Sequence, residues 1–389
     1  MTPDAPGSAR LRVVVNAIPM VNVSTGIGRY IRSLYTALEQ EHGDELEIGY
    51  FDGHCARATI PAPSGDISGW ARMVKLLWKL PPAVACGVRV FMHLRRERRF
   101  SRLAGGFDVY HETSFFPFAA SPALPVVFTI HDLSLLLHGD WHPRERVLFH
   151  RLFFRRRQRN VRHYLSVSEF TKSEMLAHLP LTSAQVTVTH LAYAGEVFHE
   201  QPAAELARVR QKHGLPERFF LFVGSGDPRK NAAIIPRALA TSGLDLPLVS
   251  VGWSGWAAGD ENSRLLRPLG YVNDADLAGI YGNALALVYP SVYEGFGLPV
   301  LEAMACGCPV VTTRCASLPE VAGEAALFMD DPTSATGLAD LLVRLAADTE
   351  LRARHRQLGL ERVKHFSWST TAKKTLNVFR ALAPGNAAA

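Results

Sequence analysis

Short apolar runs alternate with helical stretches along most of this chain. The runs expected to form strands in the first half are residues 11–16, 46–51, 109–111, 126–130 and 164–167. Those in the second half are residues 219–223, 248–251, 285–289 and 309–313. Strands that alternate with helices predict parallel sheets with helices packed on their faces. We therefore expect an α/β protein.

The length of the chain predicts two doubly wound sheets rather than one. Its 389 residues exceed the size at which a single core usually stops growing, and 48% of them are apolar, enough for two cores. Residues 195–206 show no periodic pattern and are interpreted as a linker. We place two Rossmann-like domains at 1–200 and 201–366, followed at 367–389 by a helix and a tail.

Composition disfavours several classes of protein. No apolar run reaches the roughly 18 to 20 residues of a membrane-spanning helix, and the N-terminus lacks the apolar core of a signal peptide. This predicts a cytoplasmic protein. The five cysteines have no metal-ligand spacing, and Cys306 and Cys308 have no second ligand pair nearby. We therefore expect free thiols and no bound metal.

The formal net charge of +6 includes two basic segments in the first half of the chain. In residues 70–100 and 144–162, arginines and lysines alternate with apolar residues. Such segments can rest on the anionic lipids of the inner membrane face, where each basic residue contributes about 1 kcal/mol. They can equally be solvated helix faces whose apolar side packs in the core. Nucleic acid is not expected, because no recognition motif accompanies the charge.

A glycine-rich turn joins an expected strand to an expected helix in the second half. Glu294 stands at the mouth of the loop after strand 285–289, and Glu302 lies about one turn into a helix that begins near Pro299. Backbone N–H groups converge on such a helix start, where anions and sugar hydroxyls find donors. This geometry fits a nucleotide sugar. The main-chain contacts expected are Gly295, Phe296, Gly297 and Leu298.

A second glycine turn follows strand 219–223. It begins at Gly224 and leads to Arg229 and Lys230, which we expect at the start of a helix. Two cations and a positive helix terminus that point at one place form a site for a diphosphate. The alternative interpretation is a surface pair of basic residues that caps a turn.

Both stretches belong to longer runs that resemble one enzyme family. Residues 291–311 and 317–323 resemble the donor-site signature of glycosyltransferase family 4, in which two glutamates are separated by seven residues, and residues 224–231 match its second hallmark. The resemblance implies a GT-B fold, in which an acceptor-binding domain (1–200) and a nucleotide-sugar-binding domain (201–366) face a cleft. It also implies that the C-terminal helix of residues 367–389 crosses back toward the first domain. It also implies sugar transfer from a nucleoside diphosphate donor with retained anomeric configuration.

The resemblance gives each residue of the second half a role. Glu294 is expected to bind hydroxyls of the donor sugar, and Glu302 the ribose hydroxyls of the nucleoside. Val272 is expected near the base. Arg229 and Lys230 are expected to hold the departing diphosphate, which helps to deprotonate the acceptor in a front-face substitution.

The resemblance also gives roles to residues of the first half. Gly26 and Gly28 are expected to lie under the donor phosphates and the acceptor, although small residues at a helix start can also serve packing. The third glycine of a dinucleotide-binding fingerprint is absent. His131, after strand 126–130, is expected near the transferred sugar, with Asp132 orienting its ring or capping the next segment. Glu112, with the histidine before it, is a weaker candidate for acceptor binding.

The donor and acceptor follow from the resemblance alone. We expect mannose or rhamnose from a GDP-sugar, and a glycan or lipid-linked acceptor in O-antigen or exopolysaccharide synthesis. No cofactor or metal is expected. A UDP-sugar remains open as the donor. A nucleotide-sugar 2-epimerase and a non-catalytic nucleotide-sugar-binding subunit are the alternatives from other classes.

Overall fold

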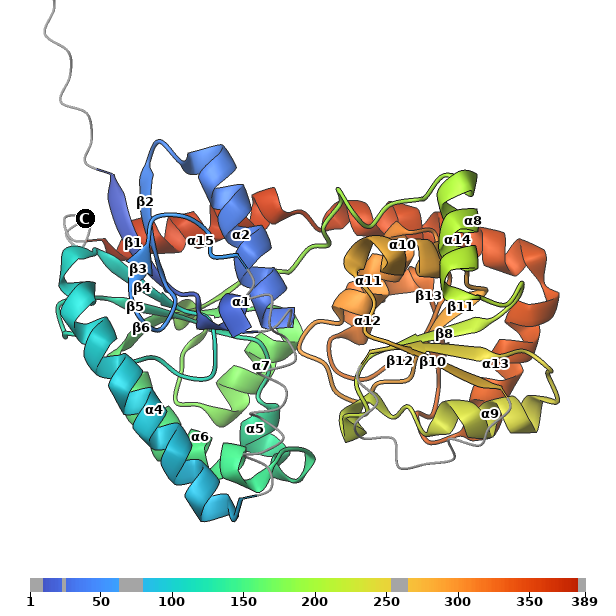
Figure 1. The fold of residues 1–389 in the computed structure, drawn as a ribbon, viewed down its shortest axis with the longest axis horizontal. Helices are drawn as coiled ribbons and strands as arrows, with labels where there is room; N and C mark the ends of the chain where they lie inside the picture. Colours follow the sequence, from blue (N-terminus) through green and yellow to red (C-terminus); the bar gives the residue numbers. More distant parts are fainter. Residues whose placement is uncertain (1–9, 23–25, 63–79, 253–264, 384–389) are drawn as a thin grey trace, which may run out of the picture. The chain divides into compact units, whose positions relative to one another are not determined.

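The computed structural model describes residues 10–22, 26–62, 80–252 and 265–383 of the chain. It divides into two compact units, one of residues 1–190 with 368–389 and the other of residues 191–367 (Figure 1). Part of the basic segment expected at 70–100 lies outside the described residues.

The first unit is built on a seven-stranded sheet with the order β3-β2-β1-β4-β5-β6-β7. All its strands are parallel except β3, which pairs with β2 in the antiparallel sense. The strands are β1 (Leu11–Asn16), β2 (Leu46–Phe51), β3 (Ala56–Arg57), β4 (Val109–Glu112), β5 (Val126–Ile130), β6 (Val161–Ser166) and β7 (Val186–Val188). Its helices are α1 (Ile18–Asn22), α2 (Gly26–His42), α4 (Pro82–Leu103), α5 (Ser134–Leu137), α6 (Arg144–Arg157), α7 (Glu169–His178) and α15 (Trp368–Leu382).

The last helix, α15, belongs to the first unit although the second unit precedes it in the chain. It packs along α2, and its buried side includes Ala372, Leu376 and Phe379. Thr371 Oγ1 donates to the carbonyl of His190 at 2.5 Å, which ties the start of the helix to this unit.

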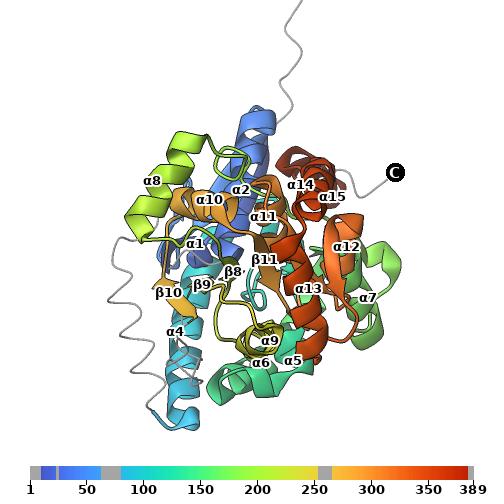
Figure 2. The ribbon, with the colours of Figure 1, turned by 90° about the vertical axis from the view of Figure 1, so that its right-hand side faces the viewer.

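The second unit is built on a six-stranded parallel sheet with the order β10-β9-β8-β11-β12-β13. The strands are β8 (Phe220–Val223), β9 (Leu248–Val251), β10 (Leu266–Gly270), β11 (Ala286–Tyr289), β12 (Val310–Thr313) and β13 (Ala326–Met329). The helices are α8 (Ala203–His213), α9 (Ile234–Ser242), α10 (Asp274–Asn283), α11 (Leu298–Ala305), α12 (Leu318–Ala322), α13 (Ala335–Ala347) and α14 (Thr349–Arg362). Helices α9 and α13 lie side by side, and their apolar residues share one core with the sheet (Figure 2).

The expected α/β class and the two Rossmann-like sheets are confirmed. The expected linker is wrong in part, because α8 begins at Ala203. This helix is held by the buried Val209 and by Arg208, which pairs with Asp276 at 2.8 Å. The boundary between the units lies at 190/191, since residues 191–200 pack on the second unit. Phe198, for example, is fully buried there beside the ring of Tyr281.

Candidate active site

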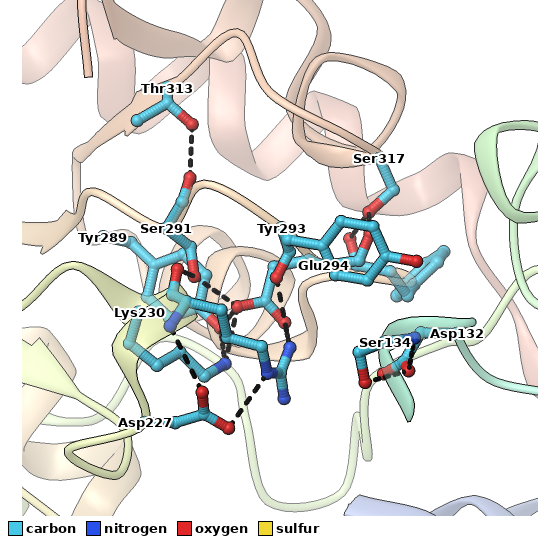
Figure 3. A network of polar contacts seen from close by, with 12 residues as sticks. Asp132, Ser134, Asp227, Lys230, Tyr289, Ser291, Tyr293, Glu294, Thr313 and Ser317 are labelled. Carbon is cyan, nitrogen blue, oxygen red and sulfur yellow. Dashed lines mark hydrogen bonds and ion pairs between the residues drawn. The ribbon is translucent and has the colours of Figure 1, made fainter. Parts of the chain in front are cut away.

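Glu294 lies in the loop between β11 and α11, where it is buried among donors. Its Oε1 accepts hydrogen bonds from Lys230 Nζ at 2.6 Å, from the Tyr289 hydroxyl at 2.9 Å and from Ser291 Oγ. Figure 3 shows Glu294 among Lys230, Tyr289 and Ser291. Glu294 Oε2 accepts from Arg229 Nη1 at 2.8 Å. The two carboxylate oxygens are therefore shared between two cations and two hydroxyls.

The charges of this cluster depend on one another. Burial opposes ionisation of Glu294, but Lys230 and Arg229 outweigh it and lower the pKa of the carboxyl to about 2. Burial lowers the pKa of Lys230, and the charge of Glu294 opposes that shift. Because the carboxylate can only accept, its short contact with Nζ requires lysine as donor. The cluster is thus a buried ion pair with a second cation attached.

The chain holds Arg229 from several sides. Strand β8 ends at Val223, and residues 228–230 form a single 3-10 turn in which the Asp227 side chain accepts from the Arg229 amide and from its Nε, both at 3.2 Å. Arg229 Nη1 also donates to the carbonyl of Tyr293 at 3.1 Å. The helix start expected at this point is this 3-10 turn and not the start of an α-helix. Asn231 adopts a left-handed conformation with φ of 51°, so the α-helix starts only at Ile234.

The glycine-rich turn has the strand-to-helix geometry expected from the sequence. Gly297 has φ of 104°, a region that favours glycine, and α11 begins at the next residue. Ser317 Oγ donates to the carbonyls of Glu294 and Phe296 at 2.9 and 2.8 Å, which fixes the turn from a distant segment (Figure 3). Sequence reasoning missed this role of Ser317, as well as those of Tyr289 and Ser291.

The other candidates of the second unit lie on neighbouring elements. Glu302 is buried in α11 and accepts from the hydroxyl of Tyr281 at 3.3 Å. Val272 is buried in the turn between β10 and α10, and Gly224 follows β8. A Cβ added at Gly252 would lie 2.1 Å from the carbonyl oxygen of Gly224, so the backbones after β8 and β9 approach closely.

In the first unit, Gly26 and Gly28 form the first turn of α2. Within the part of the chain that the structure describes, a Cβ added at Gly26 would meet no heavy atom within 4 Å. Packing against the described part of the chain therefore does not require a glycine at position 26. Gly28 is buried.

His131 follows β5 and is held from two directions. Its Nε2 lies 3.1 Å from the carbonyl oxygen of Thr113, and its ring meets the Tyr30 ring edge to face, with 4.9 Å between centroids. Burial lowers the pKa of His131 to about 4, against the opposing effects of the Thr113 bond and the Asp132 charge. The imidazole is therefore neutral at physiological pH.

Asp132 caps the next segment. Its Oδ1 accepts from the Ser134 amide at 2.9 Å and from Ser134 Oγ at 2.6 Å, at the start of α5 (Figure 3). His111 and Glu112, the weaker candidates for acceptor binding, are both fully buried. His111 lies 2.8 Å from the Tyr35 hydroxyl and from Thr129 Oγ1, so its two nitrogens have partners inside the unit.

The described residues contain neither a candidate metal site nor a candidate membrane-spanning helix. Within them no group of three or more His, Cys, Asp or Glu side chains is placed to hold a metal ion. Over the same ranges, no helix has both the length and the apolar character needed to cross a membrane. The five cysteines are free thiols.

Comparisons with known proteins give the family of the chain. Residues 205–362 match the family model of glycosyl transferases group 1, and residues 24–192 match that of Glycosyltransferase Family 4. The O-antigen chain mannosyltransferase B of Escherichia coli is 30% identical over 390 residues, covering 96% of this chain and 100% of the relative. A D-inositol 3-phosphate glycosyltransferase of an Arthrobacter species is 26% identical, covering 92% and 90%.

Solved structures share the fold. The HepE protein of Anabaena, in complex with UDP and glucose, matches with a TM-score of 0.69 and 14% identity over 96% of this chain and 100% of its own. WaaG, a glycosyltransferase involved in lipopolysaccharide biosynthesis, matches with a TM-score of 0.67 and 15% identity over 95% and 99%. Two family models and a relative aligned over its whole length agree with the site and the sheets: the chain belongs to glycosyltransferase family 4 and is a glycosyltransferase of the GT-B fold.

Proposed function

We propose that this chain is a retaining, metal-independent hexosyltransferase of surface polysaccharide synthesis. It transfers mannose or rhamnose from a GDP-sugar to a glycan or lipid-linked acceptor, as in O-antigen assembly. The observation that carries the proposal is the cluster of Glu294, Arg229 and Lys230 at the carboxyl ends of β8 and β11, which are neighbours in the sheet. Ligands of such sheets bind beyond these ends. Relatives described as O-antigen and serotype-specific mannosyltransferases support mannose as the sugar.

The cluster suits a sugar diphosphate. Arg229 and Lys230 bind the diphosphate oxygens, and the same cations stabilise the charge that develops as the nucleoside diphosphate leaves. Glu294 binds sugar hydroxyls together with the main chain of the glycine-rich turn. Glu302 binds the ribose, and Val272 lies at the base. From the first unit, His131 contacts the sugar, while Gly26 and Gly28 let the donor approach the backbone.

The environment of Glu294 argues against a covalent intermediate. Both its oxygens accept hydrogen bonds from protein donors, and a carboxyl with a pKa of about 2 is a weak nucleophile. We favour a front-face substitution. The bond from the anomeric carbon to the phosphate oxygen breaks, the acceptor oxygen bonds to that carbon on the same face, and the acceptor proton passes to the departing phosphate.

A thermal-unfolding panel of GDP-, UDP- and dTDP-sugars tests the donor. A tight donor stabilises only the folded protein, so GDP-mannose or GDP-rhamnose is expected to raise the Tm more than the other nucleotides. A UDP-sugar is the alternative, since HepE binds UDP and glucose. If only UDP-sugars raise the Tm, the donor is a UDP-sugar and the GDP assignment is wrong.

Acceptor-dependent release of nucleoside diphosphate separates the enzyme classes. A transferase releases it only with acceptor, a 2-epimerase releases it without, and a non-catalytic subunit does not release it. Activity that EDTA abolishes and magnesium restores would overturn metal independence.

The proposal includes contact with the inner membrane face through α4 and α6, which pack side by side (Figure 1). Glu97 of α4 pairs with Arg157 of α6 at 2.7 Å, and Arg89 of α4 pairs with Glu145 of α6 at 3.2 Å. These two helices contain no other acidic residue, and both glutamates are buried between them. The acidic side chains of α4 and α6 therefore face each other and not the solvent.

The outer surface of the pair is basic and apolar. Phe91 is 65% exposed, Leu152 52% and Val84 51%. The exposed arginines beside them are Arg95, Arg98, Arg102, Arg144, Arg151, Arg155 and Arg156. An anionic bilayer matches both features, because arginines bind lipid headgroups while apolar side chains enter the interface. We name this set of residues the α4–α6 surface.

A further inference from the structure

Glu112 is a fully buried carboxylate at the carboxyl end of β4, and all its partners are donors. Oε1 accepts from Asn16 Nδ2 at 2.9 Å, from the amides of Thr113 and Ser114 at 3.0 and 2.7 Å, and from Ser114 Oγ at 2.6 Å. Oε2 accepts from Asn16 Nδ2 at 3.0 Å and from the Tyr110 hydroxyl. Burial raises the pKa of Glu112, and these hydrogen bonds oppose that rise. Asn16 Nδ2 and the two main-chain amides can only donate, so the Glu112 side chain serves as their acceptor.

This carboxylate ties together two chain segments that follow neighbouring strands. Asn16 is the last residue of β1, the strand that leads toward the turn of Gly26 and Gly28. Thr113 Oγ1 also donates to the carbonyl of Asn16 at 2.8 Å. The ends of β1 and β4 are therefore joined through both the side chain and the main chain of Asn16. Removing the carboxylate would leave several buried donors without their acceptor.

The segment held by Glu112 in turn holds His131. A carbonyl oxygen only accepts, so the contact of 3.1 Å between His131 Nε2 and the Thr113 carbonyl requires a hydrogen on Nε2. In a neutral ring Nδ1 then keeps its lone pair. The Tyr30 ring fixes the plane of the imidazole, and the Tyr30 hydroxyl is itself held at 3.0 Å from Thr129 Oγ1.

We propose that Glu112 is a positioning residue that sets the tautomer of His131. It fixes the Thr113 carbonyl, this carbonyl keeps the hydrogen on Nε2, and His131 presents Nδ1 to the substrate as a hydrogen-bond acceptor. An acceptor nitrogen binds a hydroxyl and repels a phosphate oxygen. His131 therefore contacts a hydroxyl of the sugar or acceptor and not the diphosphate. This last step rests on the proposed function, whereas the tautomer does not.

The tautomer is measured directly by long-range proton–nitrogen NMR on protein labelled with ¹⁵N-histidine. Wild-type His131 is expected to be neutral at pH 7 with its hydrogen on Nε2. A hydrogen on Nδ1 would overturn the proposal, whatever the activity of the protein. A confirmed tautomer in a protein that transfers no sugar would leave the positioning role intact and refute the proposed function.

Glu112→Gln tests the positioning role. The glutamine amide turns a donor toward Asn16 or Ser114, so we expect His131 to lose its single tautomer. We expect kcat/KM to fall by about 10- to 100-fold, the scale seen when outer-shell partners of metal-bound histidines are removed. Ser114→Ala, which removes one donor, gives a smaller change in the same direction if Glu112→Gln does not fold. An unchanged tautomer and kcat/KM in a folded Glu112→Gln protein would contradict the proposal.

The matched control lies at the other end of the same two strands. Asp108 precedes β4 and pairs with Arg12 of β1 at 2.9 Å, as Glu112 pairs with Asn16 at the carboxyl ends. Asp108→Asn removes that ion pair without touching the Thr113 segment. It is expected to leave the His131 tautomer and kcat/KM unchanged.

Two substitutions at position 131 test which nitrogen faces the substrate. The amide of asparagine reaches the position of Nδ1, and that of glutamine reaches the position of Nε2. If Nδ1 contacts a substrate hydroxyl, His131→Asn retains more kcat/KM than His131→Gln. The reverse order would show that only the contact with Thr113 matters.

Discussion

The ammonium of Lys230 lies 2.6 Å from Oε1 of Glu294, and the two side chains are only 11% and 7% exposed. The residues are 64 positions apart in the sequence. Arg229 contacts the other oxygen of the same carboxylate. The two residues proposed to bind the diphosphate and the residue proposed to bind the sugar therefore form one hydrogen-bonded cluster. A substitution at any of the three is therefore expected to disturb both stability and donor binding.

A double-mutant cycle tests the strength of this ion pair. Lys230→Met leaves the Glu294 carboxylate buried without its closest cation, and such a loss typically costs roughly 3–5 kcal/mol of unfolding free energy. Glu294→Gln is expected to be costly for the same reason. Urea unfolding of both single variants and of the double variant gives the coupling energy. Additive effects of the two substitutions would show that the pair is not coupled.

The same pair predicts a loss of stability in acid. The pKa of Glu294 is lowered from 4.5 to about 2 in the folded protein, so its contribution is fully present above pH 4.5. It is lost as the pH falls from 4.5 toward 2, at about 1.4 kcal/mol for each unit of pKa difference. Other carboxylates titrate in this range, so the measurement is the difference in unfolding free energy between wild type and Glu294→Gln. A difference that does not shrink on acidification would contradict the prediction.

Gly297→Ala tests the turn that carries the main-chain donors. The left-handed φ of 104° disfavours alanine, and the added Cβ would lie 2.9 Å from Leu318 Cδ2. We expect a loss of about 1–3 kcal/mol in unfolding free energy and a higher KM for the donor. Gly87→Ala in α4 is the control, because alanine favours a helix by roughly 0.5–1 kcal/mol. Equal stability of Gly297→Ala and wild type would show that alanine does not strain the backbone at this turn.

Vesicle flotation tests the α4–α6 surface. Binding to phosphatidylglycerol vesicles is expected to exceed binding to phosphatidylcholine vesicles. It should weaken at 1 M salt, where the screening length falls to about 3 Å. Arg95→Gln with Arg98→Gln should cost about 2 kcal/mol if each arginine contributes about 1 kcal/mol. Phe91→Ser with Leu152→Ser should weaken binding through lost apolar contact.

The flotation control removes equal charge elsewhere. Arg237 and Arg354 are exposed in the second unit, and replacing both with glutamine should leave flotation unchanged. Equal loss in both double variants would mean that net charge, and not this surface, drives binding. Absence of flotation with anionic vesicles would remove the membrane proposal.

The sequence predicted those features of the site that depend on neighbouring residues. The strand, the glycine turn and the helix around Glu294 follow one another within a few residues, so their order is visible in the sequence. Ser317, in contrast, reaches the Glu294 carbonyl from 23 positions away, and a serine hydroxyl has too many alternative roles for its partner to be inferred. The tie between Asn16 and Glu112, 96 positions apart, depends on strand order in the same way.

The errors of the sequence analysis have local physical causes. Asn231 can adopt the left-handed conformation that ends a turn, so the helix expected at Arg229 is limited to one 3-10 turn. Strand β7 has three residues and β10 contains a proline and a glycine, so neither shows a strand pattern. Helix α8 has one buried residue, Val209, so its sequence lacks the periodic apolar pattern that predicts a helix.

The most direct test of the account is acceptor-dependent transfer from GDP-mannose by wild type and by Glu294→Ala at equal folded concentration. The acceptor is lipid-linked glycan in membranes, and the readout is labelled mannose joined to the acceptor together with released GDP. We expect transfer by wild type and a loss of at least about 100-fold in kcat/KM for the variant, equivalent to about 2.7 kcal/mol of transition-state stabilisation. Full turnover by Glu294→Ala would contradict the account.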